Sequence, residues 1–435
     1  MPLAPKLRGI VGDRHVLTGV GCSPYVLEGR TPEAVVFPTT RDEVSAVLVA
    51  AGEASVPVTP WGGGTRIAVG APPPRAGIVL ALKRFDKLRE HEPADLTCTV
   101  EAGMTMAALQ NALATRGQWL SLDPPHADRA TVGGTLASNA SGPRRHLYGT
   151  GRDLLIGLAM VLADGSVVRG GGKVVKNVAG YDLPKLAIGS FGTLGVIVEA
   201  TVKLRPRPDV DHLVVTRFAS LAEAGAAVRA IMASDLIPSA IDLADQDALR
   251  AAGLDGEDGA ALLVGFDGVP DQVAWQEAEL ARLIGVPGTV LDGAARDEAW
   301  KRRGELARTA FEHPTAVMTW GVLPSQSADV MAQAREAAVK RGLRCALAAH
   351  AGVGIITAVL GDGADAAAVV AAIEDWRRVV EARGGHARLD SAPLAVKERV
   401  PIWDPPGPAH RIMKRLKDEL DPRGILNPGR FVGGI

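Results

Sequence analysis

Three consecutive glycines, Gly62, Gly63 and Gly64, form the part of the sequence best suited to holding an anionic ligand. Because glycine has no side chain, such a run leaves backbone N–H groups accessible, and a row of them can cradle a pyrophosphate. Thr65 adds a hydroxyl donor and Arg66 adds a positive charge. An ordinary turn is the alternative interpretation, since the run is neither a G-x-G-x-x-G pattern nor a P-loop.

A second glycine-dense stretch, residues 172–200, has the composition of a segment that lies against a flat ligand. Its glycines are spaced among apolar residues, on both sides of an apolar run at 183–188 that we expect to be a short helix. Glycine either supplies a positive φ or lets the backbone touch a ligand directly. A planar aromatic cofactor is one interpretation of this stretch, and a glycine-rich loop between two core elements is the other.

Between these stretches, residues 130–142 are rich in small and hydroxyl side chains, and they follow a rigid turn at 123–126. Such a segment can pass close to a ligand while offering donors, although packing of small residues is the alternative. The basic residues Arg144, Arg145 and His146 come next. Arginine suits a carboxylate because its guanidinium binds in bidentate geometry, and histidine suits proton transfer near neutral pH. For each arginine, a structural ion pair or an exposed charge is the alternative.

Composition and charge exclude several classes of protein. The chain has 435 residues, of which 47% are hydrophobic and 22% charged, as in an ordinary soluble protein of two or three domains. A net charge of −1 gives no reason to expect a nucleic acid or an anionic membrane as partner. The sequence predicts neither a membrane span nor a signal peptide. Its three cysteines are far apart, which argues against an iron–sulfur or zinc site in this chain and fits the cytoplasm.

The pattern of apolar residues predicts the elements that position the glycine run. Residues 34–37 and 56–59 indicate strands, and the helix between them starts at Thr40 with Glu43 in a capping-box pattern. This β-α-β unit leads directly into Gly62. Residues 154–162 and 166–169 predict a hairpin. From about residue 210, strand-like runs alternate with alanine-rich helical runs, which is typical of an α+β domain with a sheet covered by helices. The expected strands are 212–218, 260–266, 317–322 and 355–360, and the expected helices are 221–233, 271–284, 327–341 and 364–383.

Taken in order, several motifs resemble a known family. They are WGGGTR, DPPH, ATVGGTLASNASGPRRHLYGTGRD and GGKVVKNVAGYDLPKLAIGSFGTLGVI, followed near the C-terminus by DPRGILNPGR. This order resembles the vanillyl-alcohol-oxidase/PCMH superfamily of FAD flavoproteins, and within it the FAD-binding E subunit of bacterial glycolate oxidases. The resemblance implies an α+β chain in which a two-lobed PCMH-type FAD-binding domain at 28–207 follows an N-terminal segment at 1–27. A cap domain at 208–417 and a C-terminal tail at 418–435 that returns to the FAD domain complete the chain.

The resemblance also implies which residues bind FAD. The glycine run would wrap the pyrophosphate, the segment after residue 130 would line the ribityl and ring part, and the second glycine stretch and the tail would approach the flavin and adenine. The implied residues are Gly62, Gly63, Gly64, Thr65, Thr131, Gly133, Gly134, Ser138, Asn139, Gly180, Gly192, Val196, Ile197 and Asn427. Covalent relatives carry a histidine in or just after the glycine loop; none occurs between His15 and His91 here, so we expect non-covalent FAD.

In the cap domain the sequence departs from the family pattern. Relatives that oxidise glycolate or D-lactate carry a His-x-Gly-Asp-Gly-Asn-x-His run whose histidines bind a divalent metal. Here the run starts at His350, but Val353, Ile355 and Thr357 stand where the aspartate, the asparagine and the second histidine are expected. A hard metal prefers oxygen-rich polar sites. We therefore expect no metal, and we regard a hydrogen-bonded structural role as the alternative for His350.

Two functional hypotheses follow from the resemblance. In the first, the chain is a FAD-binding subunit of a glycolate-oxidase-type complex that contains a second FAD subunit and an iron–sulfur subunit; it is cytoplasmic or membrane-associated through a partner. In the second, it is a self-sufficient dehydrogenase for a small 2-hydroxy acid. Such an enzyme needs a base and a carboxylate clamp. The candidates are Arg144, Arg145, Arg388 and Arg430 for the clamp and His126, His146 and His350 for the base.

Overall fold

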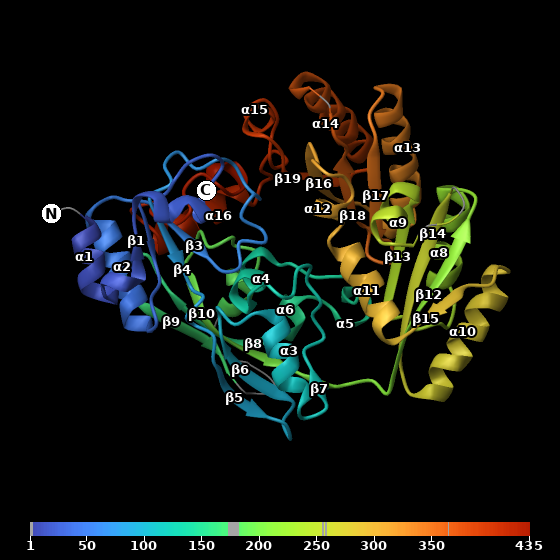
Figure 1. Cartoon of the computed structure of the whole chain (residues 1–435), viewed down its shortest axis with the longest axis horizontal. Helices are drawn as coiled ribbons and strands as arrows, with labels where there is room; N and C mark the ends of the chain where they lie inside the picture. The colour runs from blue at the N-terminus through green and yellow to red at the C-terminus, as the bar shows by residue number, and fades with distance from the viewer. Residues whose placement is uncertain (1–2, 173–181, 255, 257–258, 364) are drawn as a thin grey trace. The chain divides into compact units, whose positions relative to one another are not determined.

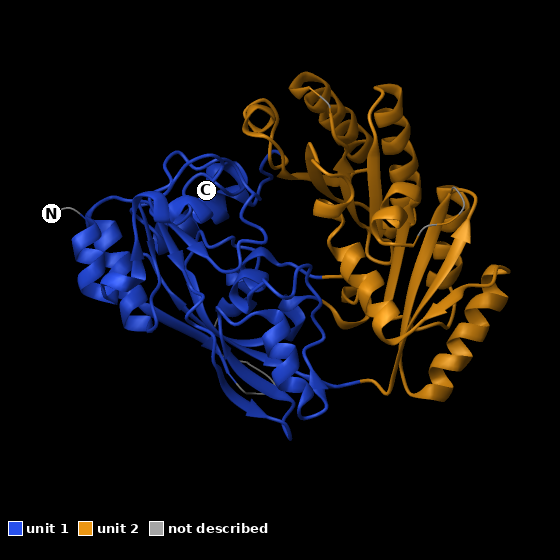
Figure 2. Cartoon of the chain, in the orientation of Figure 1, with its two compact units in different colours: residues 1–141, 150–207, 405–435 blue, residues 142–149, 208–404 orange. Residues whose placement is uncertain are grey.

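The chain forms two compact units that are each made of discontinuous segments. The computed structural model describes residues 3–172, 182–254, 256, 259–363 and 365–435. The first unit contains Met1–Ser141, Thr150–Arg207 and Pro405–Ile435, and the second contains Gly142–Gly149 and Pro208–Asp404 (Figure 2). The boundary between the units is therefore not a single cut at residue 207. Gly142–Gly149, which precedes this residue, groups with the second unit, and Pro405–Ile435, which follows it, groups with the first.

The first sheet of the first unit ends at the glycine run. Its four strands have the order β1-β2-β4-β3, and β4 pairs in parallel with both β2 and β3. Helix α2 links β2 to β3 and begins with the predicted capping box, in which the Thr40 hydroxyl accepts from the Glu43 amide at 3.1 Å. Helix α1 packs beside α2 (Figure 1). The elements are α1 Leu3–Val11, β1 Val16–Leu17, β2 Ala34–Val36, α2 Arg41–Glu53, β3 Val58–Trp61 and β4 Ile78–Ala81, with 3₁₀ turns at Asp13–His15 and Gly19–Tyr25.

The second sheet of this unit is antiparallel, with the order β5-β6-β10-β8-β9. The predicted hairpin is confirmed as β8 and β9, and one hydrophobic core joins both sheets. Small-residue helix α4 starts at Thr131, whose side chain accepts from the Gly134 amide. The elements are β5 Leu88–Glu92, β6 Thr97–Glu101, α3 Met106–Ala114, β7 Gln118–Trp119, α4 Val132–Ser138, α6 Gly151–Leu154, β8 Leu155–Val161, β9 Val167–Gly171, α7 Leu183–Ala187, β10 Val196–Lys203 and β11 Arg205–Pro206.

The C-terminal segment returns to β3 of the first unit. After helix α16 (His410–Leu420), the Ile425 carbonyl accepts from the Val58 amide at 2.7 Å, and the Asn427 amide donates to the Val58 carbonyl at 3.0 Å. Lys417, which is buried, donates at 2.8 Å to the carbonyls of both Thr193 and Leu426. The tail is thus fixed beside the glycine run, and a short 3₁₀ turn at Val432–Gly434 ends the chain.

The second unit is an eight-stranded sheet with the order β15-β12-β14-β13-β17-β18-β16-β19 and with helices packed against it, which confirms the expected α+β class. Helices α13 and α14 run side by side along it (Figure 1). The strands are β12 Val210–Phe218, β13 Ala240–Asp245, β14 Ala260–Gly268, β15 Thr289–Leu291, β16 Ala316–Gly321, β17 Cys345–His350, β18 Ile355–Leu360 and β19 His386–Ser391. The helices are α5 Arg145–Tyr148, α8 Leu221–Met232, α9 Gln246–Ala251, α10 Pro270–Ile284, α11 Gly293–Gly304, α12 Leu306–Thr309, α13 Ser327–Lys340, α14 Ala366–Glu381 and α15 Leu394–Lys397, with a 3₁₀ turn at Pro324–Gln326.

Candidate functional site

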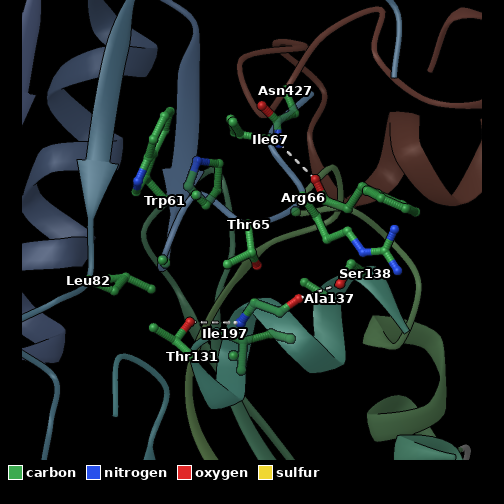
Figure 3. A pocket seen from close by; sticks show the side chains of 18 of the residues that line it. Trp61, Thr65, Arg66, Ile67, Leu82, Thr131, Ala137, Ser138, Ile197 and Asn427 are labelled. Carbon is green, nitrogen blue, oxygen red and sulfur yellow. Dashed lines mark hydrogen bonds between the residues drawn. The ribbon is translucent and has the colours of Figure 1, made fainter. Parts of the chain in front are cut away.

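A pocket in the first unit brings together most of the residues expected to bind FAD (Figure 3). In Figure 3, Asn427 from the C-terminal tail lies near the top of the view and Thr131 lies near the bottom, with Ser138 at mid-height on the right. The predicted residues that line this pocket are Gly62, Gly63, Gly64, Thr65, Thr131, Gly133, Gly134, Ser138, Gly192, Ile197 and Asn427. Segments that are far apart in the sequence therefore meet at one hollow.

The glycine run is packed so closely that side chains do not fit on it. A Cβ on Gly62 would lie 2.2 Å from the Thr131 hydroxyl oxygen, and one on Gly63 would lie 1.7 Å from the backbone oxygen of Arg129. Gly64 has φ +68°, which glycine adopts without strain. Within the described part of the chain, the amides of these three glycines donate no hydrogen bond. They are thus available to an anion in the pocket.

Asn427 presents an unmatched acceptor to the same pocket. Its Nδ2 donates to the Phe191 carbonyl at 2.7 Å, which fixes the orientation of the amide. Its Oδ1 is buried and has no hydrogen-bond partner among the described residues. Since a buried polar atom normally has a partner, Oδ1 is suited to accept from an N–H or O–H group of a bound molecule.

Arg430 also lines the pocket, but its guanidinium contacts backbone carbonyls, whereas a substrate clamp would direct it to a carboxylate. It is 4% exposed, and its Nη2 donates to the carbonyls of Ile67 and Val69, at 2.8 Å in the second case. Burial lowers the pKa of its guanidinium, and Glu28 opposes this shift. Arg430 therefore holds the segment that follows the glycine run.

Two described residues implied by the resemblance, Asn139 and Val196, do not line this pocket. Asn139 ends α4 with a left-handed φ of 49°, a conformation that asparagine tolerates well. Val196 is the first residue of β10 and its side chain is buried. Gly180 lies outside the described residues. Sequence reasoning missed Phe191, whose carbonyl orients Asn427, and the buried Lys417 that anchors the tail.

The expected clamp residue Arg144 is in an ion-pair network of the second unit. Its Nη2 lies 2.5 Å from an Asp211 oxygen and its Nη1 lies 2.6 Å from an Asp267 oxygen. The Tyr148 hydroxyl donates to the other oxygen of Asp267. These contacts favour the structural alternative for Arg144, because two buried or nearly buried carboxylates already use its donors.

The other candidates of the second unit also have partners. Arg388 donates from Nε to Asp390 at 2.5 Å, while Arg145 is half-buried at the start of α5. His146 packs against Gly352, where a Cβ would come within 2.4 Å of its Nδ1, and burial lowers the pKa of the imidazole. His126, in the first unit, has a positive φ of 58°.

His350 lies in a cluster that sequence reasoning missed in part. Its Nδ1 is 2.8 Å from Oδ1 of Asp242, and Oδ2 of that carboxylate is 2.9 Å from Nε of Arg303. Asp242 and Arg303 come from β13 and α11. Among the described residues, no group of three or more histidine, cysteine, aspartate or glutamate side chains could hold a metal ion. We call Asp242, Arg303 and His350 the Asp242 cluster.

Comparison with protein-family models covers both units. The model described as an FAD binding domain matches residues 32–171, and the model described as the C-terminal domain of FAD linked oxidases matches residues 207–387 and 407–431. The glycolate oxidase subunit GlcD of Bacillus subtilis (strain 168) is 31% identical, over 92% of this chain and 89% of that protein. The chain belongs to the FAD-linked oxidase family. The predicted cofactor FAD and the predicted oxidoreductase class are confirmed by this membership.

Other members of this family and several solved structures are similar along the whole chain. The D-lactate dehydrogenase of Archaeoglobus fulgidus is 30% identical, over 94% of each chain. The structure of p-cresol methylhydroxylase with substrate bound is 18% identical, with a TM-score of 0.78 over 98% of this chain and 96% of that one. This likeness confirms the PCMH-type fold.

The residues present in the first unit fit an FAD. The glycine amides suit a pyrophosphate, and the buried acceptor of Asn427 suits a cofactor that carries N–H and O–H groups.

Helices in the described ranges do not combine the length and apolar character that crossing a bilayer needs.

Proposed function

We propose that this chain binds FAD in the pocket of the first unit and takes part in the oxidation of a small 2-hydroxy acid, glycolate or D-lactate, to the 2-oxo acid. The observation that carries the proposal is the meeting of the uncovered glycine amides and the unmatched Asn427 acceptor in one pocket. The class of substrate comes from relatives of nearly the same length, named as a glycolate oxidase subunit and a D-lactate dehydrogenase.

In this proposal, the chain's own groups bind and orient the cofactor. The amides of Gly62, Gly63 and Gly64 bind the pyrophosphate, and Thr131 supports them from the start of α4. Asn427 accepts from a donor on the cofactor, and Arg430 keeps the following segment in place. When bound, FAD supplies a two-electron acceptor. None of the described pocket residues is a histidine or cysteine, and non-covalent attachment stays a prediction, checked by release of FAD on acid precipitation.

The proposal is tested by anaerobic titration of the purified yellow protein with glycolate and then D-lactate, followed at the flavin absorbance. Bleaching by either acid is the expected result. FAD that stays oxidised with both acids would show that the isolated chain does not oxidise them. Dithionite serves as the control that the bound flavin can be reduced.

We further propose that the chain acts as the FAD-binding E subunit of a glycolate-oxidase-type complex, cytoplasmic or attached to the membrane through a partner. A second FAD subunit and an iron–sulfur subunit would complete that complex. The cysteines of this chain, Cys22, Cys98 and Cys345, are all buried, and three cysteines are too few for a four-thiolate cluster. Electrons from its flavin therefore need another protein or a small acceptor.

A self-sufficient dehydrogenase is the second candidate function. The D-lactate dehydrogenase of Archaeoglobus fulgidus matches along 94% of both chains, so this chain has the length of a protein named for the whole activity. Turnover of D-lactate by the isolated chain with an artificial electron acceptor would favour this candidate. Turnover only after the other subunits are added would favour the complex.

A further inference from the structure

We propose that the outer face of helix α16 is the docking surface for an acidic protein that accepts electrons from the flavin. Arg411, Ile412 and Arg415 form this surface, which we call the α16 face. The class of partner rests on the proposed function, because a chain that oxidises a substrate with FAD must pass two electrons on. The place rests on the exposure and the charge of α16 itself.

The helical repeat puts these three side chains on one side of α16. Arg411 and Arg415 are four residues apart and are therefore neighbours on the helix surface, with Ile412 beside them. All three residues are exposed, Ile412 to 59%. Lys417, on the opposite side of the helix, is buried in the first unit. The α16 face is thus turned away from the body of that unit.

The two arginines of this face have no partner within the described ranges of the chain. Lys414, on the same helix, pairs with Asp418 at 3.0 Å. The side chains of Arg411 and Arg415 make neither an ion pair nor a hydrogen bond in those ranges, and Glu419, one turn after Arg415, does not pair with it. Cations four residues apart repel each other, and a cation in the first turn, as Arg411 is, also opposes the helix dipole. The α16 face therefore carries positive charge that the chain leaves unbalanced, and an acidic surface complements it.

The apolar side chains of α16 favour a protein over a bilayer as the occupant. Met413, Leu416 and Leu420 lie on the same side as Lys417 and are partly buried. A helix that binds a membrane lays its apolar face into the lipid, whereas this one uses that face to pack on its own unit. On the outer side, Ile412 bordered by arginines matches the apolar centre and charged rim of a protein interface.

Buried hydrogen bonds place α16 beside the flavin pocket. Nζ of Lys417 donates at 2.8 Å to the carbonyls of Thr193 and Leu426. Their direct neighbours in the sequence, Gly192 and Asn427, both line the pocket. The α16 face is separated from this wall by one helix diameter, about 10 Å. A protein docked there brings its redox group close to the flavin, as electron transfer between proteins requires.

The test supplies the electrons independently of the substrate. The holo-protein is reduced anaerobically with one equivalent of dithionite and mixed with the soluble haem domain of cytochrome b5, an acidic protein, in its ferric form. Two ferric haems take the two electrons of one reduced FAD, and the proton of the flavin nitrogen is released to water. Haem absorbance in a stopped-flow instrument gives the rate. In the wild type this rate should fall about tenfold when the ionic strength rises from a low value to about 0.5 M.

The double variant Arg411→Gln/Arg415→Gln removes the charge of the α16 face. We expect its rate with cytochrome b5 to be about tenfold lower at low salt. The dissociation constant of cytochrome b5 from the oxidised holo-protein, measured by isothermal titration calorimetry, should rise by a similar factor. Arg14→Gln/Arg116→Gln is the matched control, because both arginines are exposed on other elements of the first unit, and it should behave like the wild type. Equal rates and affinities in the two double variants overturn the proposal, as does a wild-type rate that salt does not change.

Two other acceptors separate docking from damage to the flavin site. Menadione, a small uncharged quinone, should reoxidise the flavin equally fast in the wild type and in both double variants. Slower reoxidation in Arg411→Gln/Arg415→Gln would show that these arginines act on the flavin site, and it overturns the proposal. Cytochrome c, a basic haem protein, should lose no rate in this variant. A loss as large as that with cytochrome b5 also overturns the proposal.

Three outcomes distinguish this surface from a lipid site and from the proposed reaction. Binding to vesicles that contain phosphatidylserine, lost in Arg411→Gln/Arg415→Gln and without affinity for cytochrome b5, makes lipid the occupant and overturns the proposal. Charge-dependent transfer after dithionite, without bleaching by glycolate or D-lactate, refutes the proposed reaction and keeps the docking surface. Bleaching by either acid, with equal transfer to cytochrome b5 in all variants, keeps the reaction and refutes the docking surface.

Discussion

The pocket of the first unit and the Asp242 cluster of the second unit are built in opposite ways. In the pocket, three consecutive glycines leave their backbone uncovered, and a Cβ on Gly63 would lie 1.7 Å from a backbone oxygen. In the cluster, buried side chains carry formal charges, and Asp242 and Arg303 are 0% and 3% exposed. The difference teaches that the first region depends on the absence of side chains and the second on the balance of their charges.

The largest expected effect tests the claim that the pocket is built from backbone. In Gly63→Ala the added methyl group collides with the Arg129 carbonyl, which cannot move without shifting α4 and the turn before it. We expect the variant to retain less than about a tenth of the FAD that the wild type retains. The measurement is flavin absorbance of the purified protein per mole of chain after denaturation.

A second glycine provides the control for this change. Gly407 has open space where its Cβ would lie, so Gly407→Ala should keep the full FAD content. Full FAD content in Gly63→Ala would show that the glycine run does not contact the cofactor. The pocket would then not be a backbone-built binding site.

The next effect tests the charge balance of the second unit. Arg144→Met leaves Asp267, whose side chain is 2% exposed, without its cation, while Asp211 keeps Arg296 at 3.0 Å. Breaking a buried pair in this way costs about 3–5 kcal/mol of the free energy of unfolding. Urea unfolding followed by tryptophan fluorescence measures the loss, since Trp320 and Trp376 lie in the core of this unit.

An exposed pair is the control for Arg144. Arg282 is paired with Glu279 on the surface of α10 and is 72% exposed, so Arg282→Met should leave the urea midpoint close to that of the wild type. A stable Arg144→Met variant that has lost its activity would instead return Arg144 to the role of substrate clamp.

The same contrast explains what the sequence could predict. Backbone-built sites depend on local residue types, so the run at Gly62 and the small residues after Thr131 could be found from composition and from the resemblance. The capping box at Thr40 was predictable for the same reason, because its partners are three residues apart. The role of Lys417 was not predictable, since its acceptors Thr193 and Leu426 come close to it only when the C-terminal tail returns to the first unit.

The charged sites of the second unit depend on pairings between distant segments. His350 was a candidate, but Asp242, 108 residues earlier, was missed because β13 was not expected and register has no local signal. Arg303 lies on α11, a strongly polar helix without an apolar stripe to reveal it. An aspartate inside the apolar run Ala240–Asp245 was the available hint of a buried charge, since such residues are rarely buried without a partner.

A smaller effect tests how costly an ionised carboxylate is in the second unit. Burial raises the pKa of Asp245 from 3.8 to about 6, although Arg335 and the Ala248 amide oppose the shift. Since the folded state binds more protons between these two values, stability falls as pH rises through this window, by up to about 3 kcal/mol. Asp245→Asn keeps the helix-capping acceptor and removes the titration.

We therefore expect the stability of Asp245→Asn, relative to the wild type, to increase by up to about 3 kcal/mol between pH 4 and pH 7. Urea unfolding at the two pH values measures it. A difference between variant and wild type that is equal at both values would show that Asp245 ionises as easily in the folded protein as in the unfolded one.

The smallest expected effect concerns a side chain that lines the backbone-built pocket, the amide of Asn427. Asn427 has a φ of 43°, which glycine adopts freely, so Asn427→Gly removes the amide group without straining the backbone. If Oδ1 accepts a hydrogen bond from FAD, the loss should be about 1 kcal/mol, or roughly fivefold in the dissociation constant measured by titrating FAD into the deflavinated protein. An unchanged constant would mean that the buried acceptor faces water when the cofactor is bound, and that the pocket recognises FAD through its backbone alone.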